Sequence, residues 1–207
     1  MASEAILANL SEKESALTTV ELFDQNGKAL AADLGGSNRS SVTVTVPALS
    51  AFSLRSAESG SPLKVGSALV SSEHPAAGTI LFSSGIAGFR GTAGVSAIAP
   101  VTRFLVPVQR DPFDQKNSGI ALANATETTI TVTLVLRNEG GAELDRRTLT
   151  LGPRAQIAQF LEQIFPNADI ATFAFRGSVS ATSTGTVAAL ALLFTGNDFA
   201  TLTVAGY

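Results

Sequence analysis

Residues 120–144 read IALANATETTITVTLVLRNEGGAEL and carry the clearest structural signal in the chain. From position 128 onward, Ile130, Val132 and Leu134 alternate with threonines. A period of two with β-branched residues on both faces is typical of a β-strand. The Asn and Gly residues of NEGG (138–141) are those that a hairpin turn tolerates. The segment therefore predicts a strand, a tight turn and a returning strand over 146–153.

The same order of features occurs earlier, in AILANLSEKESALTTVELFDQNGKAL at residues 5–30. Four anchors repeat in the same order with offsets of 115, 114, 111 and 111 residues: LAN at 7–9 and 122–124, Gly27 and Gly141, Gly66 and Gly177, and Gly85 and Gly196. Such a series indicates two copies of one fold that differ by small loop deletions. We therefore expect two domains, 1–98 and 99–207, with Asn9 and Asn124 as turn residues rather than ligands.

Each copy is expected to be an immunoglobulin-like β-sandwich, so that the fold class is all-β. The second copy supplies further strand patterns at 103–109, 118–123, 173–182, 187–195 and 199–205. Short strands at this spacing are typical of a sandwich. In the first copy, the Asn-Gly pair of DQNGK (24–28) favours a type I′ turn.

Three segments depart from simple strand patterns. RAQIAQFLEQIFPNAD has apolar residues at helical spacing and predicts a short helix at about 155–165, ending at Pro166. Its counterpart ALSAFSLRSAESG (48–60) keeps less of this pattern, so a loop or single turn is expected there. GFRGTAG (88–94) is interpreted as a hairpin bend.

The two copies differ in what precedes them. The second is preceded by the strand pattern TRFLVPVQ (102–109), whereas almost nothing precedes the first. If this strand completes the second sandwich, the first is one strand short and has an edge that another segment could pair with. The alternatives are that the missing strand lies ahead of residue 1, or that 101–109 serves the first copy.

Composition excludes several classes of function. The 207 residues are 45% hydrophobic and only 15% charged, with a net charge of −3. There is no basic surface to neutralise phosphates, so nucleic acid is not expected as a partner. The chain has no Cys, which excludes a disulfide framework. Its longest apolar run, TVAALALLF (186–194), is half the length that a membrane span needs, so no membrane insertion is expected.

Catalytic sets are also missing from the pattern. The only His is His74, in the turn-like SSEHPAAG, and the second copy has no His at the matching place. A catalytic triad needs a base beside a nucleophile and an orienting group. The close carboxylate pairs lie in expected turns or strand edges: Glu12 and Glu14, Asp111 and Asp114, and Glu143 and Asp145. We therefore predict no enzyme, no catalytic residue and no cofactor.

Two further residue sets remain open to interpretation. Asp111, Asp114 and Asn117 recur every three residues in RDPFDQKN (110–117), where they could hold a calcium ion or form an Asx turn. The spacing is not that of an EF-hand, so no metal site is predicted. The phenylalanines of the strand patterns, such as Phe173, Phe175 and Phe194, are expected in the core.

A family resemblance rests on NSGIALANATETTITVTLVLRNEGGAEL, LGPRAQIAQFLEQIFP, FRGSVSATSTGTVAALALLF and FATLTV. These segments resemble a tandem immunoglobulin-like repeat at the C-terminal ends of large secreted bacterial proteins, with its GIALAN strand, FLxxLFP helix and FxGxxxxxS strand. The resemblance covers nearly all of the second copy and the ends of the first. It implies a sandwich fold and an extracellular or cell-surface location, and no particular activity.

We therefore expect a non-enzymatic extracellular structural or adhesive protein, a spacer, matrix component or filament subunit. Its partners would be other copies of itself or other surface proteins, and strand exchange between chains could join copies, with SEAIL (3–7) or TLTVAGY (201–207) as the exchanged strand. The alternative is a binding module of an exported bacterial protein that recognises a glycan or a protein through loops at one end of a sandwich.

Overall fold

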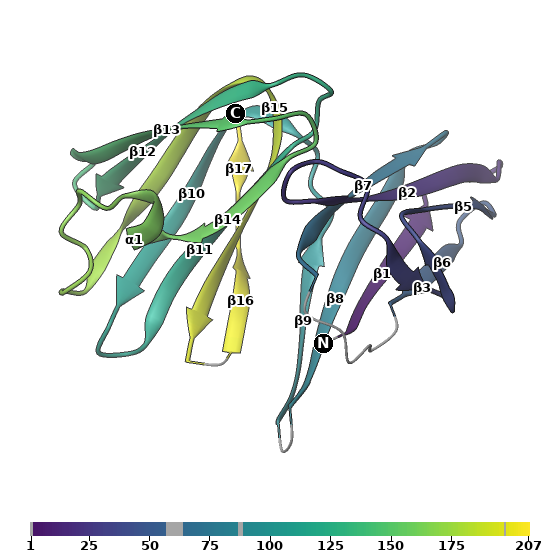
Figure 1. Cartoon of the computed structure of the whole chain (residues 1–207), viewed down its shortest axis with the longest axis horizontal. Coiled ribbons are helices and arrows are strands. Elements are labelled where there is room, and N and C mark those ends of the chain that lie inside the picture. Colours follow the sequence, from purple (N-terminus) through teal and green to yellow (C-terminus); the bar gives the residue numbers. More distant parts are fainter. Residues whose placement is uncertain (1, 57–63, 87–88, 197) are drawn as a thin grey trace. The chain divides into compact units, whose positions relative to one another are not determined.

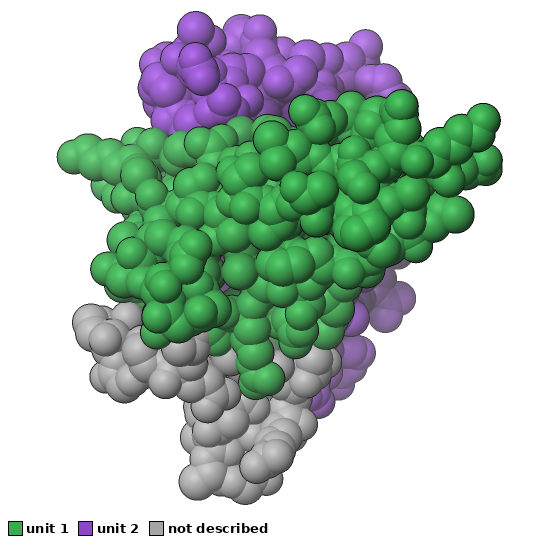
Figure 2. Space-filling model, turned by 90° about the vertical axis from the view of Figure 1, so that its right-hand side faces the viewer, with its two compact units in different colours: residues 1–97 green, residues 98–207 purple. Residues whose placement is uncertain are grey.

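The computed structural model describes residues 2–56, 64–86, 89–196 and 198–207, and its regular secondary structure is nearly all β-strand (Figure 1). This confirms the all-β prediction. The chain divides into two compact units, residues 1–97 and 98–207, which Figure 2 colours separately.

The strands of the first are β1 (Ala2–Asn9), β2 (Ala16–Asp24), β3 (Ala32–Leu34), β4 (Ser37–Arg39), β5 (Ser41–Val46), β6 (Ala51–Arg55), β7 (Gly66–Ser72), β8 (Ala76–Ile86) and β9 (Phe89–Ser96). The second contains β10 (Val101–Asp111), β11 (Lys116–Asn124), β12 (Ile130–Asn138), β13 (Glu143–Leu151), β14 (Gln156–Phe160), α1 (Leu161–Ile164), β15 (Phe175–Thr195), β16 (Asp198–Leu202) and β17 (Ala205–Gly206).

The second unit is sandwich-like and is organised around β15. Residues 175–183 of this strand lie between β12 and β10, whereas residues 187–195 lie between β11 and β16. β13 extends the first group beside β12, and β14 extends the second beside β11. The separate strands expected at 173–182 and 187–195 are therefore one continuous strand, whose two halves pair with different strands.

Nineteen buried residues form one core cluster in the second unit. β10 contributes every second side chain to this core. Phe104, Val106 and Val108 are buried, and the residues between them are exposed. Leu161 and Ile164 of α1 add their side chains to the same cluster. Burial of this much apolar surface is the main contribution to the stability of the unit.

The helix is much shorter than the expected 155–165. Residues 156–160 instead form β14, which pairs antiparallel with β11 from Ala123↔Gln156 to Gly119↔Phe160. The edge of β11 offers a full ladder of backbone hydrogen bonds to this segment, and sheet pairing prevails over the helical spacing of its apolar residues. Only Leu161–Ile164 is helical.

The first unit has two main sheets, β5-β2-β7 and β6-β1-β8-β9, and a small β3–β4 hairpin. In the sequence, this hairpin is inserted between β2 and β5, which pair with each other. In the second copy, by contrast, β13 follows β12 directly after the turn and pairs with it. Two sequence interpretations are wrong here. Residues 51–55 form β6 rather than a loop, and residues 89–94 belong to β9 rather than to a bend. Residues 57–60 and 88 of those two segments lie outside the described residues.

A buried asparagine supports the same loop pair in both units. Asn124 donates from Nδ2 to the carbonyls of Thr128, Leu151 and Gly152, and Thr126 N donates to its Oδ1 at 2.8 Å. Asn9 makes the matching bonds to the carbonyls of Glu14, Val46 and Pro47 and from Ser11 N. Both asparagines are 2% exposed. These side chains therefore have a structural role, because they satisfy carbonyl groups that burial would otherwise leave unpaired.

The glycine turns also match. Gly27 N donates to Asp24 O, and Gly141 N donates to Asn138 O, at 3.0 and 2.9 Å. Both glycines have positive φ, 79° and 82°, whereas Asn26 does not have a positive φ. A type I′ turn needs positive φ at both central residues. The prediction of type I′ at 24–28 is therefore wrong, and the turn is a tight loop that ends in a left-handed glycine.

Candidate functional site

The candidate site is the free edge of β7 in the first unit. β7 pairs with β2 from Thr18↔Ser72 to Asp24↔Gly66. Within the described residues no strand pairs with the opposite edge of β7. An unpaired strand edge presents backbone N–H and C=O groups to which another chain can add a strand.

The second unit shows which surface this edge corresponds to. β12 pairs with β15 through Leu134↔Ala181, Leu136↔Val179 and Asn138↔Gly177, and β2 pairs with β7 through Val20↔Val70, Leu22↔Ala68 and Asp24↔Gly66. The offsets are 114 residues on one strand and 111 on the other at all three pairs, so β7 is the counterpart of residues 177–183 of β15. That part of β15 is paired with β10 on the edge that is free in β7.

The glycines at this position have the same structural reason. A Cβ atom on Gly177 would lie 2.0 Å from the carbonyl oxygen of Arg137, and a Cβ atom on Gly66 would lie 2.2 Å from that of Phe23. Both strands therefore approach their neighbour so closely that only glycine fits. This shared close approach supports the equivalence of the two strands independently of the register.

Exposure differs at the matched positions, as expected where a covering strand is missing. Val179 is fully buried, whereas its counterpart Ala68 is exposed. Leu136 is fully buried, whereas Leu22 is only half-buried. The core cluster of the first unit contains five buried residues, Leu7, Val20, Leu34, Val42 and Leu54, among those that the structure describes.

His74 lies in the bend between β7 and β8, and its side chain is 30% exposed. Its Nε2 is 3.2 Å from Oε2 of Glu14. The neighbouring Glu73 instead accepts a hydrogen bond from Leu17 N at 2.9 Å, and Glu12 is exposed. The structure thus places one carboxylate, that of Glu14, beside the imidazole.

The polar side chains of the loop 110–117 bind different partners, and Asn117 Oδ1 is buried without a hydrogen bond from any described residue. Asp111 Oδ1 accepts from Phe113 N and Asp114 N, which is an Asx turn. Asp114 forms an ion pair with Lys116 at 2.8 Å, and Asn117 donates to both carboxylate oxygens of Glu162. The three residues considered for calcium therefore do not point to a common centre. No group of three or more metal-ligating side chains occurs within the described ranges.

The remaining carboxylate pair lies on β13. Glu143 accepts two hydrogen bonds from Arg146, at 3.0 and 2.9 Å, and the carboxylate of Asp145 accepts from Arg146 N at 2.7 Å. Glu143 is exposed and Asp145 is half-buried, and both lie on the outer strand β13. These hydrogen-bonded charges are typical of a solvated sheet face.

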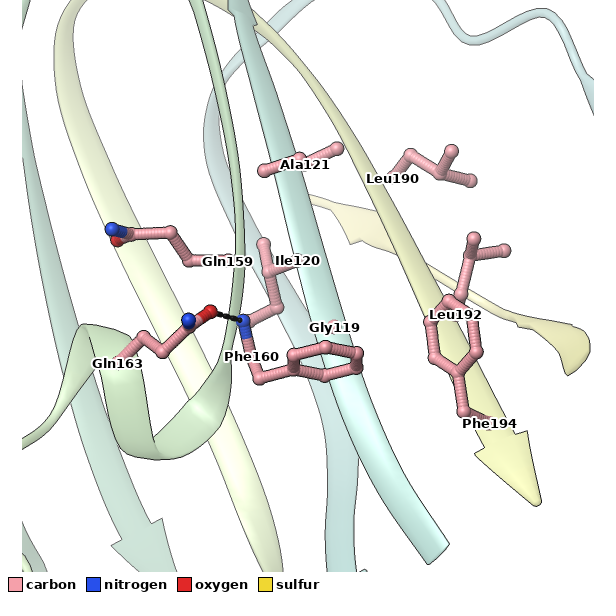
Figure 3. A pocket seen from close by; sticks show the side chains of 10 residues that line it. Gly119, Ile120, Ala121, Gln159, Phe160, Gln163, Leu190, Leu192 and Phe194 are labelled. Carbon is pink, nitrogen blue, oxygen red and sulfur yellow. Dashed lines mark hydrogen bonds between the residues drawn. The ribbon is translucent and has the colours of Figure 1, made fainter. Parts of the chain in front are cut away.

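An apolar hollow lies on the outer face of β14, β11 and β15 in the second unit (Figure 3). Phe160 and Phe194 pack edge to face above Gly119, with ring centroids 5.2 Å apart, and Gln163 accepts a hydrogen bond from Phe160 N beside them. A Cβ atom on Gly119 would lie 3.4 Å from the Phe194 ring. Leu190 and Leu192 complete the apolar wall.

This hollow was not predicted, and it corrects two core assignments. Phe194 faces outward and is partly buried against Phe160 and Phe199, and Phe173 is 64% exposed. Of Phe173, Phe175 and Phe194, Phe175 alone packs against the core cluster as expected. The usable signal was the run of apolar residues on both faces of 187–194, which indicates that one apolar face must lie outside the core.

Comparisons with protein-family models, with curated proteins and with solved structures find no match for this chain. Among the residues described, no helix is long and apolar enough to cross a lipid bilayer.

Proposed function

We propose that this chain is a non-enzymatic extracellular structural or adhesive protein, built from two immunoglobulin-like sandwich repeats and joined to other chains by strand exchange. One observation carries this proposal: the edge that β10 covers in the second unit is free on β7 in the first. The resemblance to secreted bacterial repeats supports the extracellular location. Partners are other copies of the chain or other surface proteins.

Both segments considered for exchange, residues 3–7 and 201–207, contain residues that pair within their own units. Residues 3–7 belong to β1, which pairs with β6 on one edge and β8 on the other. Residues 201–202 belong to β16, and residues 205–206 form β17, which pairs with β10. Both segments are held within their own units, so their exchange would break existing pairs. The free edge of β7 is instead an acceptor.

Electron microscopy and sedimentation of the purified chain over a range of concentrations test this proposal. We expect end-to-end oligomers or filaments when the chain is mixed with other surface proteins, because an acceptor edge and a donor strand on different molecules give a heterologous contact that does not close on itself. Particles that stay monomeric at every concentration, alone and mixed with other surface proteins of the source cell, contradict it. Glycan binding lost on changing one sandwich-end loop would favour the binding-module alternative.

A further inference from the structure

We infer that the free edge of β7 accepts one extended segment of another polypeptide, antiparallel and in a fixed register, with three alternate large apolar side chains directed into the first unit. This inference rests on the proposed function and specifies the chemistry of the partner. In the second unit, β10 fills the equivalent place.

β10 supplies both backbone pairing and core volume. It pairs antiparallel with β15 through Phe104↔Ala181, Val106↔Val179 and Val108↔Gly177. The side chains of Phe104, Val106 and Val108 are buried in the core cluster. Burial of one such side chain contributes about 1.5–3 kcal/mol, so a segment of this pattern brings a large apolar contribution in addition to its backbone hydrogen bonds.

The register carries over to β7 residue by residue. The positions opposite Phe104, Val106 and Val108 become Val70, Ala68 and Gly66. Ala68 has a smaller side chain than Val179 and is exposed, which leaves room over β7 for the inward side chains of an added strand. The incoming segment therefore has a large apolar residue opposite each of these three positions.

The segment is not β10 itself, because β10, the strand of this pattern within residues 101–111, is already in use. β10 is paired with β15 along residues 103–110. Its transfer to β7 would expose Val179 and the rest of the β15 edge, so the number of free edges would not fall. A second copy of the chain does not help, because each copy has two strand edges to cover, that of β7 and that of β15, and only one β10 to cover them. The segment therefore carries the pattern of β10 without being β10 of this chain or of a second copy.

A disulfide cross-link tests the register directly, because the chain contains no cysteine. The full chain with Ala68→Cys is mixed under oxidising conditions with a peptide of residues 100–111 that carries Val106→Cys. We expect one peptide per chain, found by mass spectrometry of the linked fragment. The matched control peptide carries Thr102→Cys, whose thiol lies four residues away, about 13 Å along a strand, and is expected to link at background level.

Affinity is measured separately, with a fluorescent peptide of residues 100–111 and the unmodified chain. A peptide with Phe104→Asp and Val108→Asp is expected to bind roughly 100-fold or more weakly, because the inward apolar contribution is lost. As a second variant, a copy of residues 101–115 placed directly before residue 1 reproduces the spacing between β10 and β11. This chain is expected to lose peptide binding, because its own added strand covers β7.

Several results would overturn the inference: equal binding of the Asp peptide, equal linking of the Thr102→Cys peptide, or no binding at all. A disulfide that joins two Ala68→Cys chains and excludes the peptide would also overturn it, because two β7 edges would then be pairing with each other. Filaments without peptide binding would leave the proposed function intact and refute this inference. Peptide binding by a chain that never assembles would support this inference and refute the proposed function.

Discussion

The two units share a framework and differ in what fills it. Asn9 and Asn124 bind equivalent carbonyls, and Gly27 and Gly141 close equivalent turns. Yet the described core cluster has nineteen buried residues in the second unit and five in the first, and β10 has no counterpart on β7 within the described residues. The hydrogen bonds of the asparagines and glycines thus persist in the first unit although the buried side chains of a strand like β10 are missing there. The two units should therefore respond differently to changes in the core and similarly to changes in these hydrogen bonds.

The largest effect is expected from Phe104→Ala in β10. Removing a fully buried Phe costs about 3–5 kcal/mol of the free energy of unfolding, and only the second unit should lose it. Hydrogen exchange in urea, followed by mass spectrometry, reports β12 and β2 separately. Leu105→Ala is the matched control, since Leu105 is 42% exposed and its loss should cost less than about 1 kcal/mol. Equal loss of protection in β2 would show that the two units are not independent.

The buried asparagines come next. Asn9→Ala and Asn124→Ala each remove three donated hydrogen bonds and leave buried carbonyls unpaired, at a cost of about 3 kcal/mol in the unit concerned. The two losses should be similar, because the networks are similar. Thermal unfolding of each variant, with the exposed Asn26→Ala as control, measures this. A much smaller loss in the first unit would mean that the framework there is already partly open.

The glycines at the close approach should respond unequally. Gly177→Ala forces a Cβ atom against Arg137 O in a strand that is held on both edges, and about 3 kcal/mol is expected. Gly66→Ala meets Phe23 O in the same way, but β7 is held on one edge and can move away, so about 1 kcal/mol is expected. Urea midpoints give both values. Equal costs would indicate that the β7 edge is as constrained as β15.

The smallest effect concerns the turn between β10 and β11 in the second unit. A side-chain hydrogen bond from Lys116, and then its charge, lower the pKa of Asp114 below the ordinary value of 3.8. The small stabilisation is thus present above that value and is lost as the pH falls through the lowered pKa. Lys116→Ala should raise the pKa of Asp114 toward 3.8 in an NMR titration, without a measurable change in stability. An unchanged pKa would show that the ion pair is not formed in solution.

The strand content was predictable because alternation in segments such as 128–138 leaves little ambiguity. The helix at 155–165 was not, because Ile157 and Phe160 suit an edge strand as well as a helix, and only the availability of the β11 edge selects the strand. The asymmetry ahead of the two copies is visible in the sequence. That the free edge belongs to β7 is not visible, because the order of strands in a sheet is set by tertiary pairing. The outward position of Phe194 was missed because both faces of that segment are apolar.

β15 gives the second unit a mechanical property that the first does not share. Because one unbroken strand of 21 residues pairs in both halves of the sandwich, no bend separates the two halves along this path and a load on one half passes directly to the other. In the first unit the corresponding path is divided into β7 and β8, joined by the bend at His74. Under tension, the first unit would therefore extend sheet by sheet and act as the compliant element, and the second would resist until it fails as a whole.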